Sequence, residues 1–387
     1  MLPLHVDVAV VGGGAVGASV ALAAKAAGRS VLLVEARARD ADVRDPRVLA
    51  LSHASQQALA ASGIWHDGMP STPIDRVHVS QAAAFGRTVL DRDDLGLAHL
   101  GHSVAYSDLY AAAREALLAA GVPVAFSSRA TTLRSGSSFA ELGIAPDGAA
   151  PHWLTARLVV LADGGGLIDQ LPDVVRREHD YRQCAVLARL RPGTPHGNVA
   201  FERFSARGPM ALLPVGDELM AVWTRSHDDA ERLIALDDEA FGAEFGAAFG
   251  ERLGRLTPTA PRLAVPLRLK VANRIVSRRV ALAGNAAQTM HPIAAQGLNL
   301  GLRDAALLSG LIARPGDAGD ATRLAEYARR RRVDSLAVTG FTHSLVTLFD
   351  HQDPVSRGAR GAVMAVLDAV PTFRKRFASS LVFGIGG

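Results

Sequence analysis

The chain has 387 residues, of which 49% are hydrophobic and 21% charged, and this balance excludes a wholly disordered protein. Its 42 Lys and Arg against 38 Asp and Glu leave a net charge of only +4, with arginine scattered among acids. Because nucleic-acid binding needs a concentrated basic face, we expect no nucleic-acid partner. The single cysteine, Cys184, excludes an internal disulfide and a cysteine zinc site, and we expect no metal site.

The start of the chain gives no sign of targeting. It lacks the positively charged segment of a signal peptide. The uncharged stretch of residues 8–24 contains three consecutive glycines and is shorter than a spanning helix of about 20 residues. Together with the single cysteine, these features predict a cytoplasmic protein.

The first elements in chain order form a βαβ unit. Residues 8–11 are a short apolar run, typical of a parallel strand buried on both faces. The alanine-rich residues 18–27 predict a helix, and residues 30–35 predict the next strand. Such a unit opens many nucleotide-binding folds.

The turn between the first strand and the helix carries the pattern G-x-G-x-x-G at Gly12, Gly14 and Gly17. Gly12 permits the tight turn, Gly14 lets a diphosphate approach the backbone, and Gly17 allows close helix–strand packing. Ala15 opens the helix, whose free N–H groups and dipole favour an anion. Glu35 ends the second strand, where an acid accepts hydrogen bonds from ribose hydroxyls and disfavours the 2′-phosphate of NADP. The pattern predicts bound FAD or NAD.

The later elements extend this α/β pattern and then interrupt it. In order they are a helix over 108–120, a buried strand over 158–162, short β-like runs between about 181 and 275 with one helix over 237–253, a buried strand over 279–283 and a helix over 298–312.

The predicted fold class is therefore α/β, with a Rossmann-like FAD-binding core, an inserted β-sheet (α+β) substrate domain and a helical C-terminus. The predicted parts are a discontinuous core of residues 1–75, 100–180 and 276–330, a β-rich substrate domain of residues 76–99 and 181–275, and a C-terminal helical region of residues 331–387.

Two further turns follow buried strands, at the edge of the sheet where open α/β folds bind ligands. A polar side chain in the second turn can reach a ribityl chain, and the helix after it can turn its N-terminal N–H groups toward a reduced flavin ring. The candidate residues in these segments are Asp163, Gly284, Asn285, Gly297, Leu298 and Asn299.

In this combination the motifs resemble those of the flavoprotein aromatic hydroxylases, the group A monooxygenases, and the resemblance covers essentially the whole chain. The family's marks are the first glycine motif, an Asp-Gly pair, here Asp163-Gly164, and a late run with Pro292 before a Gln-Gly-x-Asn loop. The resemblance is greatest to the ubiquinone-biosynthesis hydroxylases, above all the 2-polyprenyl-6-methoxyphenol hydroxylases. The segments that carry it are residues 45–52, 63–65, 200–214 and 284–304.

The resemblance implies FAD as cofactor, NAD(P)H and O2 as co-substrates, and hydroxylation of a polyprenylated phenol through a flavin C4a-hydroperoxide. Arg47 is then expected to contact flavin or nicotinamide, although a surface ion pair with Asp45 explains it equally well. His291, beside Pro292, is the candidate to deprotonate the phenol, with a loop-orienting hydrogen bond as the other interpretation.

The sequence also departs from the family in three places. Asn285 stands where the general family has Asp, which the resemblance marks as normal for the methoxyphenol branch. Gly165 and Gly166 replace the usual Ser and Arg after the Asp-Gly pair, so we expect an anchoring interaction to be missing there. Asp108 lies near a position where many relatives have an arginine that faces the cofactor.

Three alternatives remain open. The first is a sister enzyme that hydroxylates another position of the same ring, and the second is a non-catalytic flavin-fold scaffold. The third is a flavin halogenase, which resembles this family but carries a Trp-x-Trp-x-x-Pro motif and a catalytic lysine. The three tryptophans of this chain form no such motif.

The C-terminal residues 336–349 and 361–383 have apolar helical faces. One interpretation is a helix pair that closes the core. The other is a surface that contacts the inner face of a membrane and admits a polyprenyl tail, assisted by the basic runs 329–332 and 374–376. Other ubiquinone-biosynthesis proteins are further expected partners.

Overall fold

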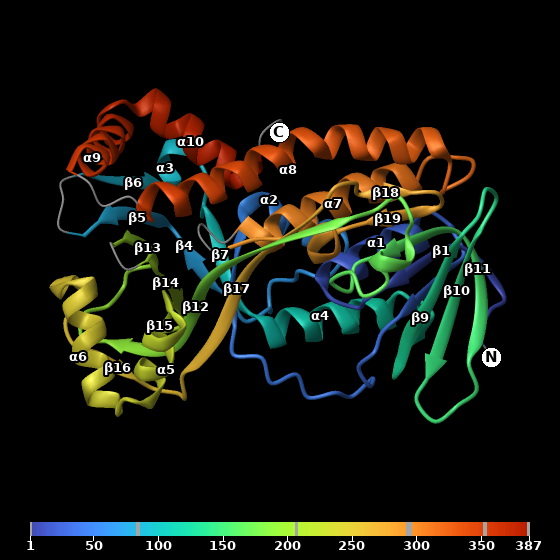
Figure 1. Cartoon of the computed structure of the whole chain (residues 1–387), viewed down its shortest axis with the longest axis horizontal. Helices are drawn as coiled ribbons and strands as arrows, with labels where there is room; N and C mark the ends of the chain where they lie inside the picture. Colours follow the sequence, from blue (N-terminus) through green and yellow to red (C-terminus); the bar gives the residue numbers. More distant parts are fainter. Residues whose placement is uncertain (1, 83–85, 206–207, 292–295, 351–353, 385–387) are drawn as a thin grey trace.

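The computed structural model describes residues 2–82, 86–205, 208–291, 296–350 and 354–384. Figure 1 shows a parallel-sheet core with helices at one end of the molecule, a second large sheet at the other end, and a long C-terminal helix across both. This architecture confirms the predicted α/β fold class.

The core is an eight-stranded sheet whose central strands are parallel. Six of its strands, in spatial order, are β18 (Val276–Ser277), β19 (Val280–Leu282), β11 (His152–Leu161), β1 (His5–Val11), β2 (Val31–Val34) and β8 (Val124–Ala125). One face packs against α1 (Ala15–Ala26), α4 (Tyr106–Ala119) and α7 (Gln296–Ile312). Val8 and Val10 face these helices whereas Ala9 and Val11 face the opposite side, which explains the unbroken apolar run of β1.

Strand β11 is longer than predicted because one of its edges has two partners. Residues 152–156 pair antiparallel with β10 (Ala140–Pro146), which continues to β9 (Ser128–Ser135). Residues 159–161 pair parallel with β19. Sequence analysis missed β9 and β10, which cover the second face of the core with Leu133, Leu142 and Ile144.

The second large sheet has nine strands and brings together distant segments of the chain. Its strands are β20 (Gln288–Thr289), β17 (Leu263–Ala272), β12 (Arg176–Pro192), β15 (Glu218–Ser226), β14 (Met210–Val215), β13 (Val199–Phe204), β5 (Arg76–Gln81) and β6 (Arg87–Asp91), with β16 (Leu256–Pro258) on β12. Strand β5 pairs parallel with β13, so the two segments predicted as β-rich share one sheet. The division of the chain into domains stays a prediction.

Helices α5 (His227–Ala235) and α6 (Asp238–Phe249) cover the outer face of this sheet, where Trp223 packs edge-on against Phe241 and Phe245. The predicted helix over 237–253 ends early because Gly250 adopts a φ of +100°. A short 3-10 turn over Glu251–Leu253 follows it.

A small sheet contacts both α7 and strand β14 of the nine-stranded sheet. Its strands are β3 (Val48–Ser52), β7 (Gly101–Ala105) and β4 (Thr72–Ile74), and α2 (His53–Ala61) follows β3 directly. Between β6 and β7 lies the single turn α3 (Arg92–Leu95).

The C-terminal region is helical, as predicted, and consists of α8 (Ala321–Asp350), α9 (Pro354–Ala369) and α10 (Pro371–Phe383). Helix α8 packs on α7, while α10 buries Ala378 and Val382 against Leu90 and Leu100. In the described part of the chain, no helix combines the length and the apolarity that crossing a bilayer requires.

Candidate functional site

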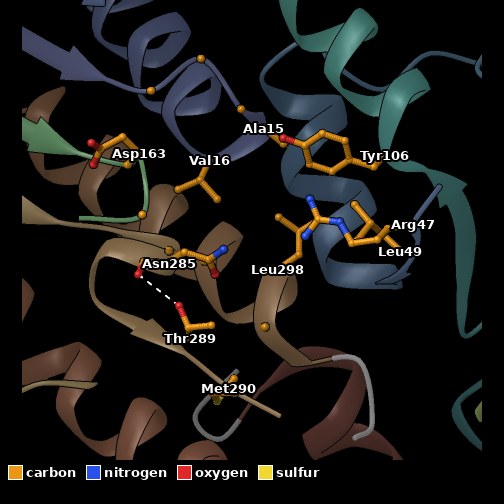
Figure 2. A pocket seen from close by; sticks show the side chains of 18 of the residues that line it. Ala15, Val16, Arg47, Leu49, Tyr106, Asp163, Asn285, Thr289, Met290 and Leu298 are labelled. Carbon is orange, nitrogen blue, oxygen red and sulfur yellow. Dashed lines mark hydrogen bonds between the residues drawn. The ribbon is translucent and has the colours of Figure 1, made fainter. Parts of the chain in front are cut away.

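A cavity of about 920 Å³ is lined by the turns at the carboxyl edge of the core sheet and by the inner face of the nine-stranded sheet. Figure 2 shows side chains of the turns, among them Asp163 and Asn285. The turns after β1, β2, β11 and β19 meet here because parallel strands end at the same edge. The predicted site residues that line the cavity are Gly12, Gly14, Ala15, Glu35, Arg47, Asp163, Gly284, Asn285, His291, Gly297 and Leu298.

Two predicted residues lie behind this lining, and Pro292 lies outside the described residues. A Cβ on Gly17 would lie 2.0 Å from the carbonyl oxygen of Gly12, so Gly17 serves helix–strand packing. Asn299 accepts a hydrogen bond from the Ser52 N–H at 2.9 Å and donates to the Ala50 carbonyl at 2.9 Å. It therefore holds β3 at the start of α7 and acts as a positioning residue.

The glycine turn has the geometry that a diphosphate needs. Gly12 has a φ of +103°, and a Cβ there would lie 2.8 Å from the backbone of Ala162. Gly14 has no heavy atom within 4 Å of its Cβ position, so its face is open to the cavity. Helix α1 begins without a side-chain cap or an acidic residue in its first turn. Its first N–H groups are therefore available to an anion.

Glu35 is held in place at the end of β2. Its Oε2 accepts a hydrogen bond from the Gly13 N–H at 2.6 Å, and its Oε1 accepts one from the Arg37 N–H at 2.9 Å. The residue is only 5% exposed and still lines the cavity. Because each carboxylate oxygen has a further lone pair, Glu35 can also accept bonds from ribose hydroxyls.

The turn after β11 is stabilised by two side chains. Asp163 accepts hydrogen bonds from the N–H groups of Gly165 at 2.9 Å and Gly166 at 3.3 Å. Arg176, on β12, donates through Nη1 to the carbonyl of Gly164 at 3.3 Å. An arginine from the neighbouring sheet thus contacts this turn, while the predicted loss of an anchoring interaction at Gly165 and Gly166 stays a prediction. The sequence pattern did not predict this role of Arg176, because the residue lies in the polar first part of β12, before the apolar residues that mark the strand.

Arg47 forms the predicted ion pair with Asp45 and also lines the cavity, and its contact with flavin or nicotinamide stays a prediction. Its Nε donates to Asp45 at 2.8 Å, and this hydrogen bonding raises the pKa of Arg47. Its guanidinium also lies 4.7 Å from the ring centre of Tyr106 and lines the cavity, as Figure 2 shows. Tyr106, which sequence analysis missed, is the first residue of α4 and lines the cavity, whereas Asp108 does not.

Asn285 lies in the turn after β19, and His291 follows shortly after it, beyond β20. His291 is 2% exposed, and its ring packs edge-on against the Tyr181 ring, with 5.3 Å between the ring centres. Burial lowers the pKa of His291 to about 4, so the ring is neutral at pH 7, and its catalytic role stays a prediction. Asn285 is exposed and lines the cavity, and the Thr289 hydroxyl donates to the main-chain carbonyl of Asn285 at 3.4 Å.

These features together fit FAD. The open glycine turn suits the diphosphate, Glu35 suits a ribose, and Asn285 with the start of α7 suits the ribityl chain and the flavin ring. The cavity continues from these turns to the nine-stranded sheet, which leaves a second region for a substrate.

Comparisons with known proteins agree with this geometry. Residues 5–342 match the family model described as FAD binding domain. The chain is 34% identical to ubiquinone hydroxylase UbiL of Rhodospirillum rubrum, with 93% of this chain and 86% of the relative covered. It is 29% identical to 3-demethoxyubiquinol 3-hydroxylase of Escherichia coli, with 88% and 91% covered.

Solved structures agree in fold. The p-nitrophenol 4-monooxygenase PnpA of Pseudomonas putida superposes with a TM-score of 0.78 at 17% identity, with 98% of each chain covered. The predicted FAD cofactor and the resemblance to flavoprotein hydroxylases are confirmed by the family match and the curated relatives. The chain belongs to the FAD binding domain family.

Proposed function

We propose that this protein is an FAD-dependent monooxygenase that hydroxylates the ring of 2-polyprenyl-6-methoxyphenol in ubiquinone biosynthesis, with NAD(P)H and O2 as co-substrates. The observation that carries the proposal is the continuity of one cavity from the dinucleotide turns to a largely apolar sheet face. That face suits an aromatic ring with an isoprenoid tail. The apolar side chains on it are Val77, Ala200, Ala211, Leu213 and Val222. The names of the two relatives support the pathway.

FAD, when bound, supplies the transfer of electrons from NAD(P)H to O2. The protein's own residues bind and orient. The N–H groups at the start of α1 would hold the diphosphate, Glu35 would hold a ribose, and the backbone at Gly297 and Leu298 would lie beside the flavin ring. The apolar sheet face excludes water from the ring of the substrate.

A sister enzyme that hydroxylates another position of the same ring is the second candidate, and the name of the Escherichia coli relative favours it. A flavin halogenase has less support, since Lys25, Lys270 and Lys375, the three lysines of the chain, are all described and none lines the cavity. A non-catalytic scaffold has less support, because the names of the two curated relatives are those of hydroxylases.

The test is mass spectrometry of the quinone-pathway lipids in a strain that lacks this protein. Accumulation of 2-polyprenyl-6-methoxyphenol, or of an earlier phenol behind it, with loss of ubiquinone supports the proposal. Accumulation of a later demethoxy intermediate supports the sister enzyme. A normal ubiquinone profile contradicts both.

The proposal includes contact with an anionic membrane surface at the corner between α9 and α10. Val366, Val370 and Phe373 are 49%, 36% and 53% exposed there, and Lys375 and Arg376 follow on α10. Apolar side chains beside basic ones suit the interface of an anionic bilayer, where a polyprenyl substrate would reside.

A further inference from the structure

Glu202, on β13, places a carboxylate on the apolar sheet face that lines the cavity. Strand pairing aligns it with Ala211 of β14, which in turn aligns with Val222 of β15, and on its other side with Val79 of β5. Residues that are paired in this way point to the same face of a sheet. Glu202 therefore lies in a row of small and aliphatic side chains.

The side chains of the neighbouring row lie on the opposite face of the sheet, although Phe201 itself still borders the cavity. His78 and Phe201 are paired across β5 and β13, and Phe201 packs into the core beneath α6 against Phe249. Because side chains alternate along a strand, the cavity side of Glu202 is fixed by this burial of Phe201.

Glu202 makes no hydrogen bond or ion pair with any residue that the structure describes. A carboxylate in apolar surroundings is costly, and proteins retain such groups where a ligand uses them. A phenol hydroxyl is the complementary partner, because it donates a hydrogen bond and can give up its proton.

We propose that Glu202 is the base that accepts the phenolic proton of the ring substrate. The inference rests on the proposed function and assigns a further catalytic residue within it. The proton passes from the phenol oxygen to a Glu202 carboxylate oxygen and returns to the phenolate oxygen of the product, and no other bond to Glu202 forms or breaks. The phenolate is more electron-rich and therefore more reactive toward an oxygen electrophile.

The charges around Glu202 are consistent with this role. Burial raises the pKa of Glu202 to about 8, and no cation among the described residues lowers it. A base with such a pKa is well matched to a weakly acidic phenol at neutral pH. The titratable side chains that share the cavity with Glu202 are Glu35, Arg37, Arg47, Tyr106, Arg129, Asp163 and His291.

His291 is the competing base in the same cavity. Burial lowers the pKa of its ring to about 4, which makes it a weaker proton acceptor than Glu202. Its ring edge also packs against Tyr181, an arrangement that suits orientation of the loop.

The experiment compares the FAD-loaded wild type with Glu202→Gln, Glu202→Asp, His291→Asn and the control Glu231→Gln, an exposed carboxylate on α5. The substrate is 2-allyl-6-methoxyphenol, and a ring-fluorinated counterpart supplies a hydroxyl that ionises more readily. The readouts are bound FAD, hydroxylated product, and the pH dependence of kcat/KM.

We expect kcat/KM to rise with pH, with a midpoint near pH 8, in the wild type and in Glu231→Gln. Glu202→Asp should show the same rise, called the rising limb, at a reduced rate. Glu202→Gln should bind FAD normally, lose the limb, and fall about 10²-fold in kcat/KM at pH 7. The fluorinated phenol should restore most of this loss, because it supplies phenolate without a base.

A Glu202→Gln variant with the wild-type limb and rate overturns the inference, as does loss of the limb in His291→Asn alone. Loss of activity in Glu202→Gln that the fluorinated phenol does not restore also overturns it, since it indicates a structural role. A wild type that binds FAD but hydroxylates no phenol contradicts the proposed function instead, so the two failures are distinguishable.

Discussion

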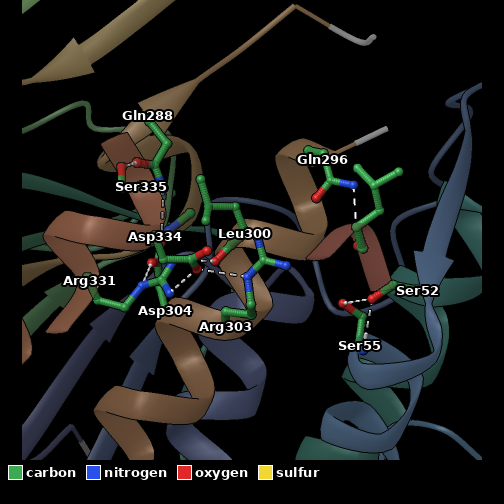
Figure 3. Close-up of polar contacts among 12 residues, drawn as sticks. Ser52, Ser55, Gln288, Gln296, Leu300, Arg303, Asp304, Arg331, Asp334 and Ser335 are labelled. Atoms are coloured by element: carbon green, nitrogen blue, oxygen red, sulfur yellow. Dashed lines mark hydrogen bonds and ion pairs between the residues drawn. The ribbon is translucent and has the colours of Figure 1, made fainter. Parts of the chain in front are cut away.

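Arg331 of α8 and Asp304 of α7 form a buried ion pair, with 2.6 Å between Nε and Oδ1 (Figure 3). The other oxygen of Asp304 accepts a hydrogen bond from the Gly284 N–H at 3.0 Å, in the turn that lines the cavity after β19. Asp334 completes the cluster by pairing with both Arg331 and Arg303. Helix α8 is therefore linked through the Asp304 carboxylate to the cavity-lining turn after β19.

This cluster predicts the effect of Arg331→Met. The substitution leaves Asp304 buried with one fewer cation, so we expect a loss of about 3–5 kcal/mol in the free energy of unfolding. Urea denaturation of the FAD-free protein measures it. The control is Arg314→Ala, which breaks an exposed pair with Glu326 and should cost far less stability, because solvent screens that pair. Equal effects of the two variants would contradict the prediction.

Two glycines of the first turn should respond differently to alanine. Gly17→Ala places a methyl group against the Gly12 carbonyl and should destabilise the FAD-free protein by about 2 kcal/mol or more. Gly14→Ala meets no atom within 4 Å, so it should leave the unfolding temperature unchanged and weaken FAD binding, because the methyl group occupies the path of the diphosphate. Thermal unfolding and flavin titration separate the two effects. The same loss of stability in both variants is the contrary result.

Arg176→Ala should weaken FAD binding about tenfold, because the turn after Asp163 loses its hydrogen bond from the neighbouring sheet. The matched control is Arg177→Ala, whose side chain is exposed on the same strand. Flavin fluorescence gives both dissociation constants. If the two variants bind FAD equally well, Arg176 is not the anchor of this turn.

Acid should destabilise the protein below about pH 6.5. Burial lowers the pKa of His78, His102 and His291 to about 4, so between these pH values the unfolded chain binds protons that the native chain does not. Each histidine then removes about 1.4 kcal/mol of stability per pH unit as the pH falls. Above pH 7 this contribution is constant.

Urea denaturation between pH 7.5 and about pH 4.5 tests this dependence. His78→Phe should make the free energy of unfolding depend less steeply on pH, since phenylalanine fits beside Phe201 and takes up no proton. The exposed His66→Phe serves as the control and should keep the wild-type pH dependence. The same pH dependence of the free energy of unfolding in the two variants would contradict this prediction.

The α9–α10 corner should bind anionic vesicles. Phe373→Ser combined with Val370→Ser should reduce the bound fraction several-fold, because apolar area is lost from the interface. Added salt should weaken wild-type binding by screening Lys375 and Arg376. Leu263→Ser, which removes an exposed leucine on β17, is the matched control in vesicle sedimentation. Wild-type binding that neither salt nor the corner substitutions reduce contradicts the proposal.

The parts of the fold that could be predicted from sequence are those with local patterns. The apolar run of β1, the glycine turn and the alanine-rich α1 lie together in the chain, so they predicted the first βαβ unit and the position of Glu35. The turns at Asp163 and Gly284 were predicted because each follows a buried strand.

The parts that were missed depend on pairing between distant segments. Nothing local marks Arg176 as a partner of the Gly164 carbonyl, because the contact needs β12 to reach across from the other sheet. Likewise, Glu202 follows Phe201 in an ordinary strand pattern. Only the pairing of β13 with β5 and β14 shows that the Glu202 side chain, and not the Phe201 ring, points toward the cavity. Tyr106 was missed for the same reason, since its ring meets Arg47 from another element.

The parallel pairing of β5 with β13 also bears on how the protein is made. During synthesis β5 emerges long before β13, so its edge must wait unpaired, and slow pairing of distant strands exposes a nascent chain to aggregation. The cofactor turn at Gly284 and its Arg331 link emerge later still. Most of the chain therefore has to emerge from the ribosome before the binding place for FAD is complete, so flavin binds late in synthesis or after it.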